Sequence, residues 1–324
     1  MTTILNDDPE LLARIRHEDS GVRRIALLEL ADYADDEHIP VFIAALNDPA
    51  ADVRTQAARA LESCESPEGT AALALALADA DEDVRAAAAQ TLSELKQTSS
   101  AAPLLPHVSH ASPYVRAAVL RGLRELRVPG SLGPALVALE DADATVRREA
   151  VSVLGYLKHP DALTPLTAAA RGDAAPEVRR AAIGALGYAG DAVPAHVLDT
   201  LLNALADPVW QVREEAATTL GKLRPASAAG ALTALLDDDY WQVRLRAARG
   251  LGRLRHAGAI APLAAALSHT IANLRKEAAL ALGEIGDARA LPALAAIQDD
   301  ADPEVRKSAR LAIGQIRKTA GSAA

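Results

Sequence analysis

Apolar residues recur along this chain at the period of an α-helix. In the segment 207–223, apolar side chains follow Val212 at intervals of 4, 5, 8 and 11 residues, and this spacing places them on one helical face. Another apolar segment precedes each segment of this kind and often carries a proline near its start, where amides lack intrahelical acceptors. These prolines are Pro103, Pro134, Pro165, Pro262 and Pro292. The pattern predicts a succession of paired helices.

The paired segments belong to an internal repeat that is marked by the dipeptide Val-Arg. Successive copies are 31 residues apart, except for intervals of 32 and 34 on either side of Val178, where a longer turn or first helix is expected. The valines are Val22, Val53, Val84, Val115, Val146, Val178, Val212, Val243 and Val305, and Leu274 fills the remaining place. Positions within a repeat are counted from this residue as zero. Ten units at so regular a period predict a solenoid, because one helical hairpin cannot bury its apolar face without its neighbours.

Three further positions recur within the repeat. Glycine at +9 is expected where a neighbouring helix comes close or where the helix ends. Aspartate at −5 is expected to cap free amides in the connecting turn, and the arginine at +1 is expected to pair with such an aspartate within or between units. Histidine takes the place of this aspartate at His17, His110 and His269, where we expect a capping or solvated ring.

The unit Asp-x-x-x-x-Val-Arg-x-x-Ala-Ala-x-x-Leu-Gly resembles HEAT repeats, most closely the short bacterial kind found in phycobilisome lyase subunits. The resemblance covers about residues 10–318. It implies an all-α fold, a right-handed α-α superhelix of about ten helical hairpins whose second helices line the concave side. We therefore expect a single solenoid over residues 1–318 and a flexible C-terminal tail at 319–324.

Composition narrows the class of protein. Half of the residues are hydrophobic and only 2% are aromatic, so Ala, Leu, Val and Ile supply the core. The formal charge of −9 opposes nonspecific binding of nucleic acid. The single cysteine, Cys64, stands at +11 and is expected to be a buried core thiol. No apolar run is long enough to span a membrane, and the acidic start lacks the features of a signal peptide, which together predict a cytoplasmic protein.

Motifs that carry chemistry are scarce. Among HEAT-like proteins, deoxyhypusine hydroxylase binds two irons through several His-Glu dipeptides, and only His17-Glu18 matches that pattern here. No zinc-binding helix motif, Gly-rich phosphate loop or nucleophile elbow occurs in the sequence. We therefore expect no catalytic residue, no metal site and no cofactor.

The candidate binding residues stand on the second helices, at positions +2, +3, +6 and +10, which are expected to face the concave groove. They are Arg121, Glu125, Tyr156, Tyr188, Lys222, Arg246, Arg249 and Arg253. Three aromatic residues, Trp210, Tyr240 and Trp241, are expected along one rim, where the alternative is that the tryptophans pack between successive hairpins. Tyr, Trp and Arg dominate interface energetics. The arginines between Arg244 and Arg255 form either a solvated face or a site for an anionic partner.

These residues favour a noncatalytic scaffold that holds another protein or a peptide segment in its concave groove. The alternative is an accessory protein of the bilin-lyase type, which the resemblance implies and which would assist cofactor attachment or the maturation of a metalloenzyme or pigment protein. A HEAT-like nucleic-acid-processing protein is disfavoured by the net charge and by acidic groove residues such as Glu214. The sequence does not identify the partner, and no membrane is expected to be involved.

Overall fold

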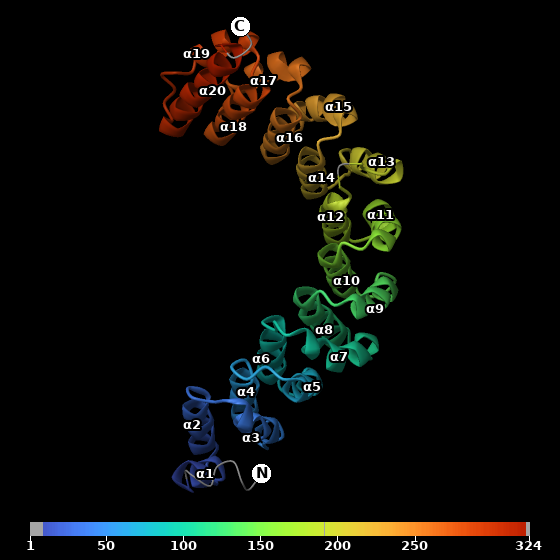
Figure 1. The fold of residues 1–324 in the computed structure, drawn as a ribbon, viewed down its shortest axis with the longest axis vertical. Coiled ribbons are helices and arrows are strands. Elements are labelled where there is room, and N and C mark those ends of the chain that lie inside the picture. Colours follow the sequence, from blue (N-terminus) through green and yellow to red (C-terminus); the bar gives the residue numbers. More distant parts are fainter. Residues whose placement is uncertain (1–8, 191, 322–324) are drawn as a thin grey trace. The chain divides into compact units, whose positions relative to one another are not determined.

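The computed structural model describes residues 9–190 and 192–321, and all regular structure in these ranges is helical. The described part of the chain contains twenty α-helices and ten short 3₁₀ helices (Figure 1). The chain divides into two compact units, Met1–Ala162 and Leu163–Ala324, called here the N-terminal and the C-terminal unit. The predicted all-α solenoid of ten hairpins is confirmed; that the two units form one continuous solenoid stays a prediction.

The N-terminal unit contains five hairpins. Their first helices are α1 (Pro9–Ile15), α3 (Ile39–Ala45), α5 (Pro67–Ala76), α7 (Ala101–Leu104) and α9 (Leu132–Ala138). Their second helices are α2 (Ser20–Ala31), α4 (Ala51–Ala60), α6 (Glu82–Ser93), α8 (Pro113–Leu126) and α10 (Ala144–Leu157). The 3₁₀ helices are η1 (Asp36–His38), η2 (Thr98–Ser100), η3 (Leu105–Ser109), η4 (Pro129–Ser131) and η5 (Pro160–Ala162).

The C-terminal unit repeats the same plan. Its first helices are α11 (Leu163–Gly172), α13 (Ala195–Ala204), α15 (Ala229–Ala234), α17 (Ile260–Ala266) and α19 (Leu291–Ala295). Its second helices are α12 (Pro176–Ala185), α14 (Trp210–Leu223), α16 (Trp241–Leu254), α18 (Ala272–Ile285) and α20 (Pro303–Gly321). The 3₁₀ helices are η6 (Leu186–Tyr188), η7 (Ala226–Ala228), η8 (Leu235–Asp237), η9 (Ala257–Ala259) and η10 (Ala288–Ala290).

Within each unit the helices form two layers, because every second helix packs against the second helix of the next hairpin and the first helices follow the other side (Figure 1). The apolar stripe predicted from the repeat forms the core. In α14, the side chains of Val212, Ala216, Ala217 and Leu220 are fully buried. Small residues at +4 and +5 leave room for the neighbouring helix.

The glycines at +9 mark close approaches between second helices of the C-terminal unit. A Cβ atom added to Gly221 would lie 2.9 Å from the Cα of Gly250, and one added to Gly252 would lie 2.8 Å from the Cα of Ala281. A side chain at either position would force the helices apart. Gly314 occupies the same position in the last hairpin and has no neighbour within 4 Å. The prediction that these glycines permit a close helix approach is confirmed for Gly221 and Gly252.

Three other expectations can be placed on the structure. Cys64 is 3% exposed, and burial raises the pKa of its thiol, which confirms the core reading. Helix α20 ends at Gly321, so it runs into the segment expected to be a flexible tail, and residues 322–324 lie outside the described residues. In the described ranges, no helix is both long and apolar enough to cross a membrane.

Candidate binding site

The arginine at +1 joins each of six hairpins to the next one. Its Nε and Nη2 atoms donate to both oxygens of the aspartate at −5 of the following hairpin, at 2.7–3.0 Å, while Nη1 donates to two carbonyl oxygens of its own turn. This Arg–Asp ladder comprises the pairs Arg23–Asp48, Arg54–Asp79, Arg116–Asp141, Arg179–Asp207, Arg213–Asp238 and Arg275–Asp300. The predicted Arg–Asp partnership is confirmed, and each pair joins two consecutive hairpins.

The ladder aspartates also hold the turn that precedes the second helix. In the turn before α6, for example, Asp79 Oδ1 accepts a hydrogen bond from the N–H of Asp81 at 2.8 Å. Asp81 is the N-cap residue of α6, so the amide that Asp79 binds lies just before the first helical turn. The aspartate at −5 therefore binds a backbone amide as predicted. That amide belongs to the N-cap residue and not to the first turn of the helix.

Histidine interrupts the ladder at His110 and His269. Nδ1 of each ring accepts the backbone N–H two residues further on, at 3.1 and 3.0 Å, which confirms the predicted capping role. In place of a carboxylate, Arg244 meets the His269 ring, with Nη1 3.4 Å from Nε2. Arg85 and Arg244 therefore lack the bidentate carboxylate that the other six arginines bind.

Three of the candidate groove arginines are held by carboxylates of the neighbouring second helix. Arg121 Nη2 donates to Glu149 Oε1 at 3.1 Å, and Arg246 Nε donates to Glu214 Oε1 at 3.0 Å. Arg249 makes a bidentate pair with Glu277, with both distances 2.7 Å. Glu149 and Glu277 are buried, with side chains 5% and 7% exposed. One donor nitrogen of Arg121, one of Arg246 and two of Arg249 are thus already used inside the chain.

The three rim aromatics do not form one continuous stack. The rings of Trp210 and Tyr240 stack with their centroids 5.3 Å apart and their planes at 14°, and the guanidinium of Arg213 lies 5.7 Å from the Tyr240 ring centroid. Trp210 is half-buried between its own hairpin and the next one, as in the alternative in which the tryptophans pack between hairpins. Trp241 is also half-buried, and Tyr240 is 45% exposed.

The two tyrosines at +10 lie in different units. Tyr156, in the N-terminal unit, is 41% exposed and lies between the guanidinium groups of Arg124 and Arg127, at 5.5 and 5.2 Å. Glu125 is exposed beside Arg124, whose Nε donates to it at 2.9 Å. Tyr188, in the C-terminal unit, is half-buried, and burial raises its pKa to about 12.

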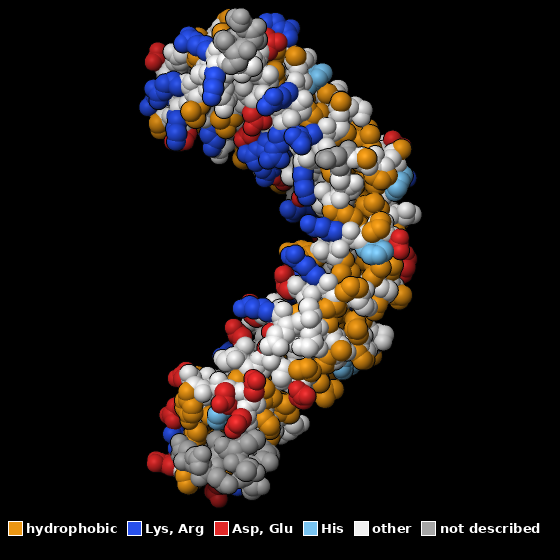
Figure 2. All heavy atoms as spheres, viewed as in Figure 1, with side chains coloured by type: hydrophobic (Ala, Val, Ile, Leu, Met, Phe, Trp, Pro, Cys, Tyr) orange, Lys and Arg blue, Asp and Glu red, His pale blue; other side chains and the backbone are white. Residues whose placement is uncertain are grey.

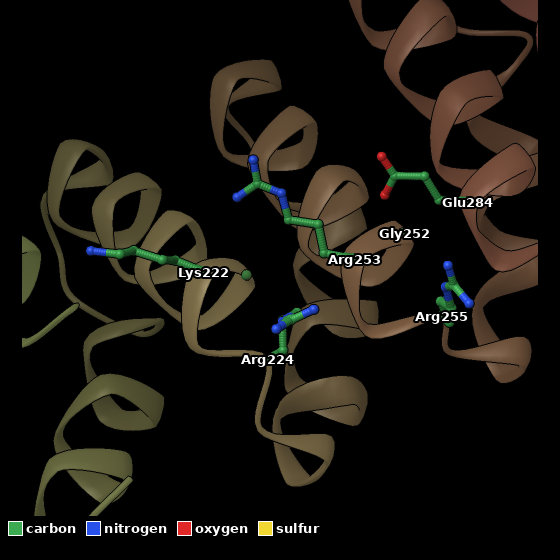
Figure 3. A pocket seen from close by; sticks show the side chains of 7 residues that line it. Lys222, Arg224, Gly252, Arg253, Arg255 and Glu284 are labelled. Atoms are coloured by element: carbon green, nitrogen blue, oxygen red, sulfur yellow. The ribbon is translucent and has the colours of Figure 1, made fainter. Parts of the chain in front are cut away.

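Lys222 and Arg253 both line one pocket of the C-terminal unit, of about 370 Å³, and the Lys222 ammonium extends away from Arg253, toward Gly187 (Figure 3). Helix α14 and its C-cap supply Gly221, Lys222 and Arg224, α16 and its C-cap supply Gly252, Arg253 and Arg255, and α18 supplies Glu284. We call this the basic pocket. In the part of the chain that the structure describes, none of its four basic side chains forms a hydrogen bond or an ion pair. All four are exposed.

Two of these basic residues hold a backbone conformation that normally favours glycine. Arg224 and Arg255 are C-cap residues with φ of 54° and 51°, and Arg127 and Lys158 have the same conformation in the N-terminal unit. The left-handed region costs a non-glycine residue about 1–2 kcal/mol. A cation near a helix C-terminus offsets part of this through the helix dipole. Position +12 is therefore basic in four hairpins at the expense of local backbone strain.

The charge of the two units differs in sign. The N-terminal unit has 15 Lys and Arg against 26 Asp and Glu, a net −11, whereas the C-terminal unit has 19 against 17, a net +2. Figure 2 shows Lys and Arg side chains gathered over the second helices of the C-terminal unit. Burial raises the pKa of Glu284, the one acidic residue lining the basic pocket. The acidic whole-chain charge thus conceals a locally basic surface.

Sequence reasoning missed two members of this pocket. Arg224 and Glu284 were not among the candidate residues, although a basic residue recurs at +12 in Arg127, Lys158, Arg224 and Arg255 and could have been noticed. Glu284 stands at +10, in the same register as Lys222 and Arg253. Whether any of the candidate residues binds a partner stays a prediction.

The structure defines the class of this protein as an all-helical solenoid of two-helix repeats. A family model of HEAT repeats matches residues 9–93, 101–187, 163–243 and 231–314. The chain therefore belongs to the HEAT-repeat family. The closer likeness to the phycobilisome lyase kind stays a prediction. A search among curated proteins found no match.

Solved structures share this fold at low sequence identity. A chain in the structure of Kap95p with RanGDP is 14% identical with a TM-score of 0.65, and the alignment covers 94% of this chain but 50% of that one. A chain in the structure of Kap121p bound to Pho4p is also 14% identical, with a TM-score of 0.65 and coverage of 94% and 41%. The Escherichia coli protein YibA is 22% identical, with a TM-score of 0.54 and coverage of 93% and 97%. These likenesses show the fold alone.

Proposed function

We propose that this protein is a noncatalytic interaction scaffold that binds an acidic segment of a partner protein on the second-helix face of its C-terminal unit. The observation that carries the proposal is the set of four exposed basic side chains in the basic pocket that form no hydrogen bond or ion pair with a carboxylate of the described residues. Elsewhere on these helices arginines such as Arg213 and Arg249 are paired with carboxylates at 2.7–2.9 Å.

The contrast between paired and unpaired arginines gives the proposal its physical basis. An unpaired guanidinium keeps its full set of donors for carboxylate recognition, whereas a paired one must first release its own carboxylate. Arg249 and Arg253 stand four residues apart on α16, and Arg249 is hydrogen-bonded to Glu277. Glu284 faces Arg253, but in the described residues the two form no hydrogen bond or ion pair. The basic pocket is therefore the part of the predicted groove that is most ready to bind an external anion.

Binding of a peptide suits the shape and the charge of this surface better than duplex binding does. The pocket is open and of about 370 Å³, and the unit that carries it has a net charge of only +2. Duplex binding requires many simultaneous phosphate contacts along an extended basic face. The cofactor-handling alternative has less support, because Arg249, one of the residues it would use, already donates from Nε and Nη2 to Glu277 at 2.7 Å.

The proposal is tested by fluorescence anisotropy with a labelled decamer of glutamate and the full-length protein. The pocket variant carries Lys222→Gln, Arg224→Gly, Arg253→Gln and Arg255→Gly, because glycine removes the charge and also fits the left-handed backbone. We expect this variant to bind at least about tenfold more weakly, since each of several exposed ion pairs contributes a fraction of a kcal/mol. The affinity of the unaltered protein should fall as salt is added.

A matched control separates the pocket from net charge. The control variant carries Arg59→Gln, Lys96→Gln, Arg127→Gly and Lys158→Gly, which removes the same charge from exposed positions in the N-terminal unit and changes the same number of left-handed residues. We expect it to bind like the unaltered protein. Equal losses in both variants would refute the pocket as the site. Tighter binding of a DNA duplex than of the acidic decamer would favour a nucleic-acid partner instead.

A further inference from the structure

The residues at +10 form a single row across the second helices of the C-terminal unit. In chain order they are Tyr188, Lys222, Arg253, Glu284 and Gln315, and each stands on or next to one of the successive second helices, which pack against one another. We call them the +10 row. Lys222, Arg253 and Glu284 all line the basic pocket (Figure 3). The row thus presents two cations followed by one anion.

The +9 glycines shape this row as well as the helix packing. A Cβ atom added to Gly187 would lie 3.3 Å from Lys222 Nζ, and one added to Gly252 would lie 2.9 Å from Glu284 Oε2. The side chains of Lys222 and Glu284 therefore lie over the glycine of the preceding hairpin. Figure 3 shows the Glu284 carboxylate extending from α18 toward α16. Lys222 and Glu284 thus rest on the preceding hairpin, and the order of charges along the row follows the order of the hairpins.

The spacing of the row can be compared with that of an extended peptide. Packed helices lie about 8–10 Å apart, and an extended chain advances about 3.3 Å per residue. One hairpin therefore corresponds to about three residues of an extended ligand. Side chains three residues apart on such a ligand can meet Lys222, Arg253 and Glu284 in turn.

We infer that the basic pocket recognises an extended segment with acidic residues at its first and fourth positions and a basic residue at its seventh, aligned with Lys222, Arg253 and Glu284. This inference rests on the proposed function and adds the register to it. Arg224 and Arg255, at +12, flank the sites of the two acidic ligand residues and strengthen the binding of their carboxylates. Glu284 excludes a third acidic residue, because two carboxylates facing each other repel and an unpaired one is costly to desolvate.

The register is tested with labelled peptides of identical composition. In one set, two glutamates and one lysine are each placed three positions apart in a serine peptide, and the order of the charges is made in both chain directions. In the other set, the three charged residues are adjacent. We expect the better direction of the spaced set to bind about fivefold more tightly than the contiguous isomer, since the contiguous peptide can satisfy fewer exposed pairs at once.

A charge exchange tests the role of Glu284 directly. The variant Glu284→Lys is expected to prefer a peptide in which the lysine is replaced by a third glutamate, whereas the unaltered protein prefers the lysine peptide. Glu304→Lys is the matched control, because Glu304 is exposed on α20 outside the +10 row and the change in net charge is the same. This control should keep the original preference. Circular dichroism verifies that both variants fold.

The outcomes separate the register from the proposed function. If acidic peptides bind but spacing has no effect and Glu284→Lys does not invert the preference, the register is wrong and the acidic-segment proposal stands. If Glu304→Lys inverts the preference as well, long-range charge decides and the +10 row does not. If no acidic peptide binds, both inferences fall together.

Discussion

Removing one carboxylate of the Arg–Asp ladder should weaken the joint between two hairpins much more than removing an ordinary surface charge. Asp79 accepts three hydrogen bonds, from Arg54 Nε and Nη2 and from the N–H of Asp81, each at 2.8 Å. The side chains of Arg54 and Asp79 are only 16% and 15% exposed, so little water can replace the lost oxygen atoms. The perturbation is Asp79→Ala.

The expected loss follows from these contacts. A hydrogen bond to a charged group contributes about 1.5–3 kcal/mol, and leaving a buried charge without its partner costs about 3–5 kcal/mol. Partial exposure reduces these values, so we expect Asp79→Ala to lower the free energy of unfolding by about 3 kcal/mol. Asp79→Asn keeps an acceptor for the backbone amide but loses the charge, and a loss of about 2 kcal/mol is expected.

The assay is urea unfolding of the full-length chain, followed by circular dichroism, together with amide hydrogen exchange in α4 and α6. Exchange resolves the local joint, because solenoid hairpins can open without the whole chain unfolding. A double-mutant cycle with Arg54→Met isolates the pair while keeping the apolar stem of the arginine. We expect a coupling energy of about 2 kcal/mol.

The chain offers a matched control in an exposed ion pair. Glu304 and Lys307 lie 3.8 Å apart with side chains 62% and 63% exposed. Glu304→Ala should change stability by less than about 0.5 kcal/mol. If Asp79→Ala and Glu304→Ala have equal effects, the ladder is an ordinary set of surface ion pairs and the reasoning is refuted.

Three further predictions follow from the same contacts. His110→Asp should raise stability by about 1–2 kcal/mol in urea unfolding, because it gives Arg85 the carboxylate that the other joints have; a loss of stability would show that the histidine is the better residue there. Gly252→Ala should lower the free energy of unfolding by about 2 kcal/mol or more, because the added methyl group overpacks the contact between helices. Gly314→Ala, with open space around it, should raise the free energy of unfolding by about 0.5–1 kcal/mol. Equal effects of the two variants in thermal unfolding would contradict the close approach of helices at Gly252. Hydrogen bonds from arginine lower the pKa of the ladder aspartates Asp79, Asp141 and Asp300 in the folded state. The contribution of these aspartates to the free energy of unfolding is therefore complete above the unfolded pKa of about 4 and is lost as the pH falls through the folded pKa. A free energy of unfolding in urea that does not change from pH 5 to pH 2 would argue against this.

The sequence by itself determined the hairpin, the number of hairpins and the pairing of the +1 arginine with a −5 aspartate, and the structure showed that the aspartate belongs to the following hairpin. These features are set by short-range rules, since helical periodicity, a turn and a residue that recurs once per unit are all visible along the chain. The burial of Cys64 and the capping role of His110 followed from the same register. Each of these predictions needed only the position of a residue within its own repeat.

Tertiary structure decided which of the repeated side chains remain available to a partner. Arg249 and Arg253 are chemically identical and lie on one helix, yet Glu277 from α18 binds the first and no carboxylate pairs with the second in the described residues. Trp210 stacks on Tyr240 because neighbouring hairpins place position −2 of one repeat against position −3 of the next. Such outcomes depend on the offset between adjacent helices, which is fixed by side-chain packing and by the +9 glycines together. The period of a sequence gives the residues in a hairpin, and only the packed structure gives the alignment of one hairpin with the next.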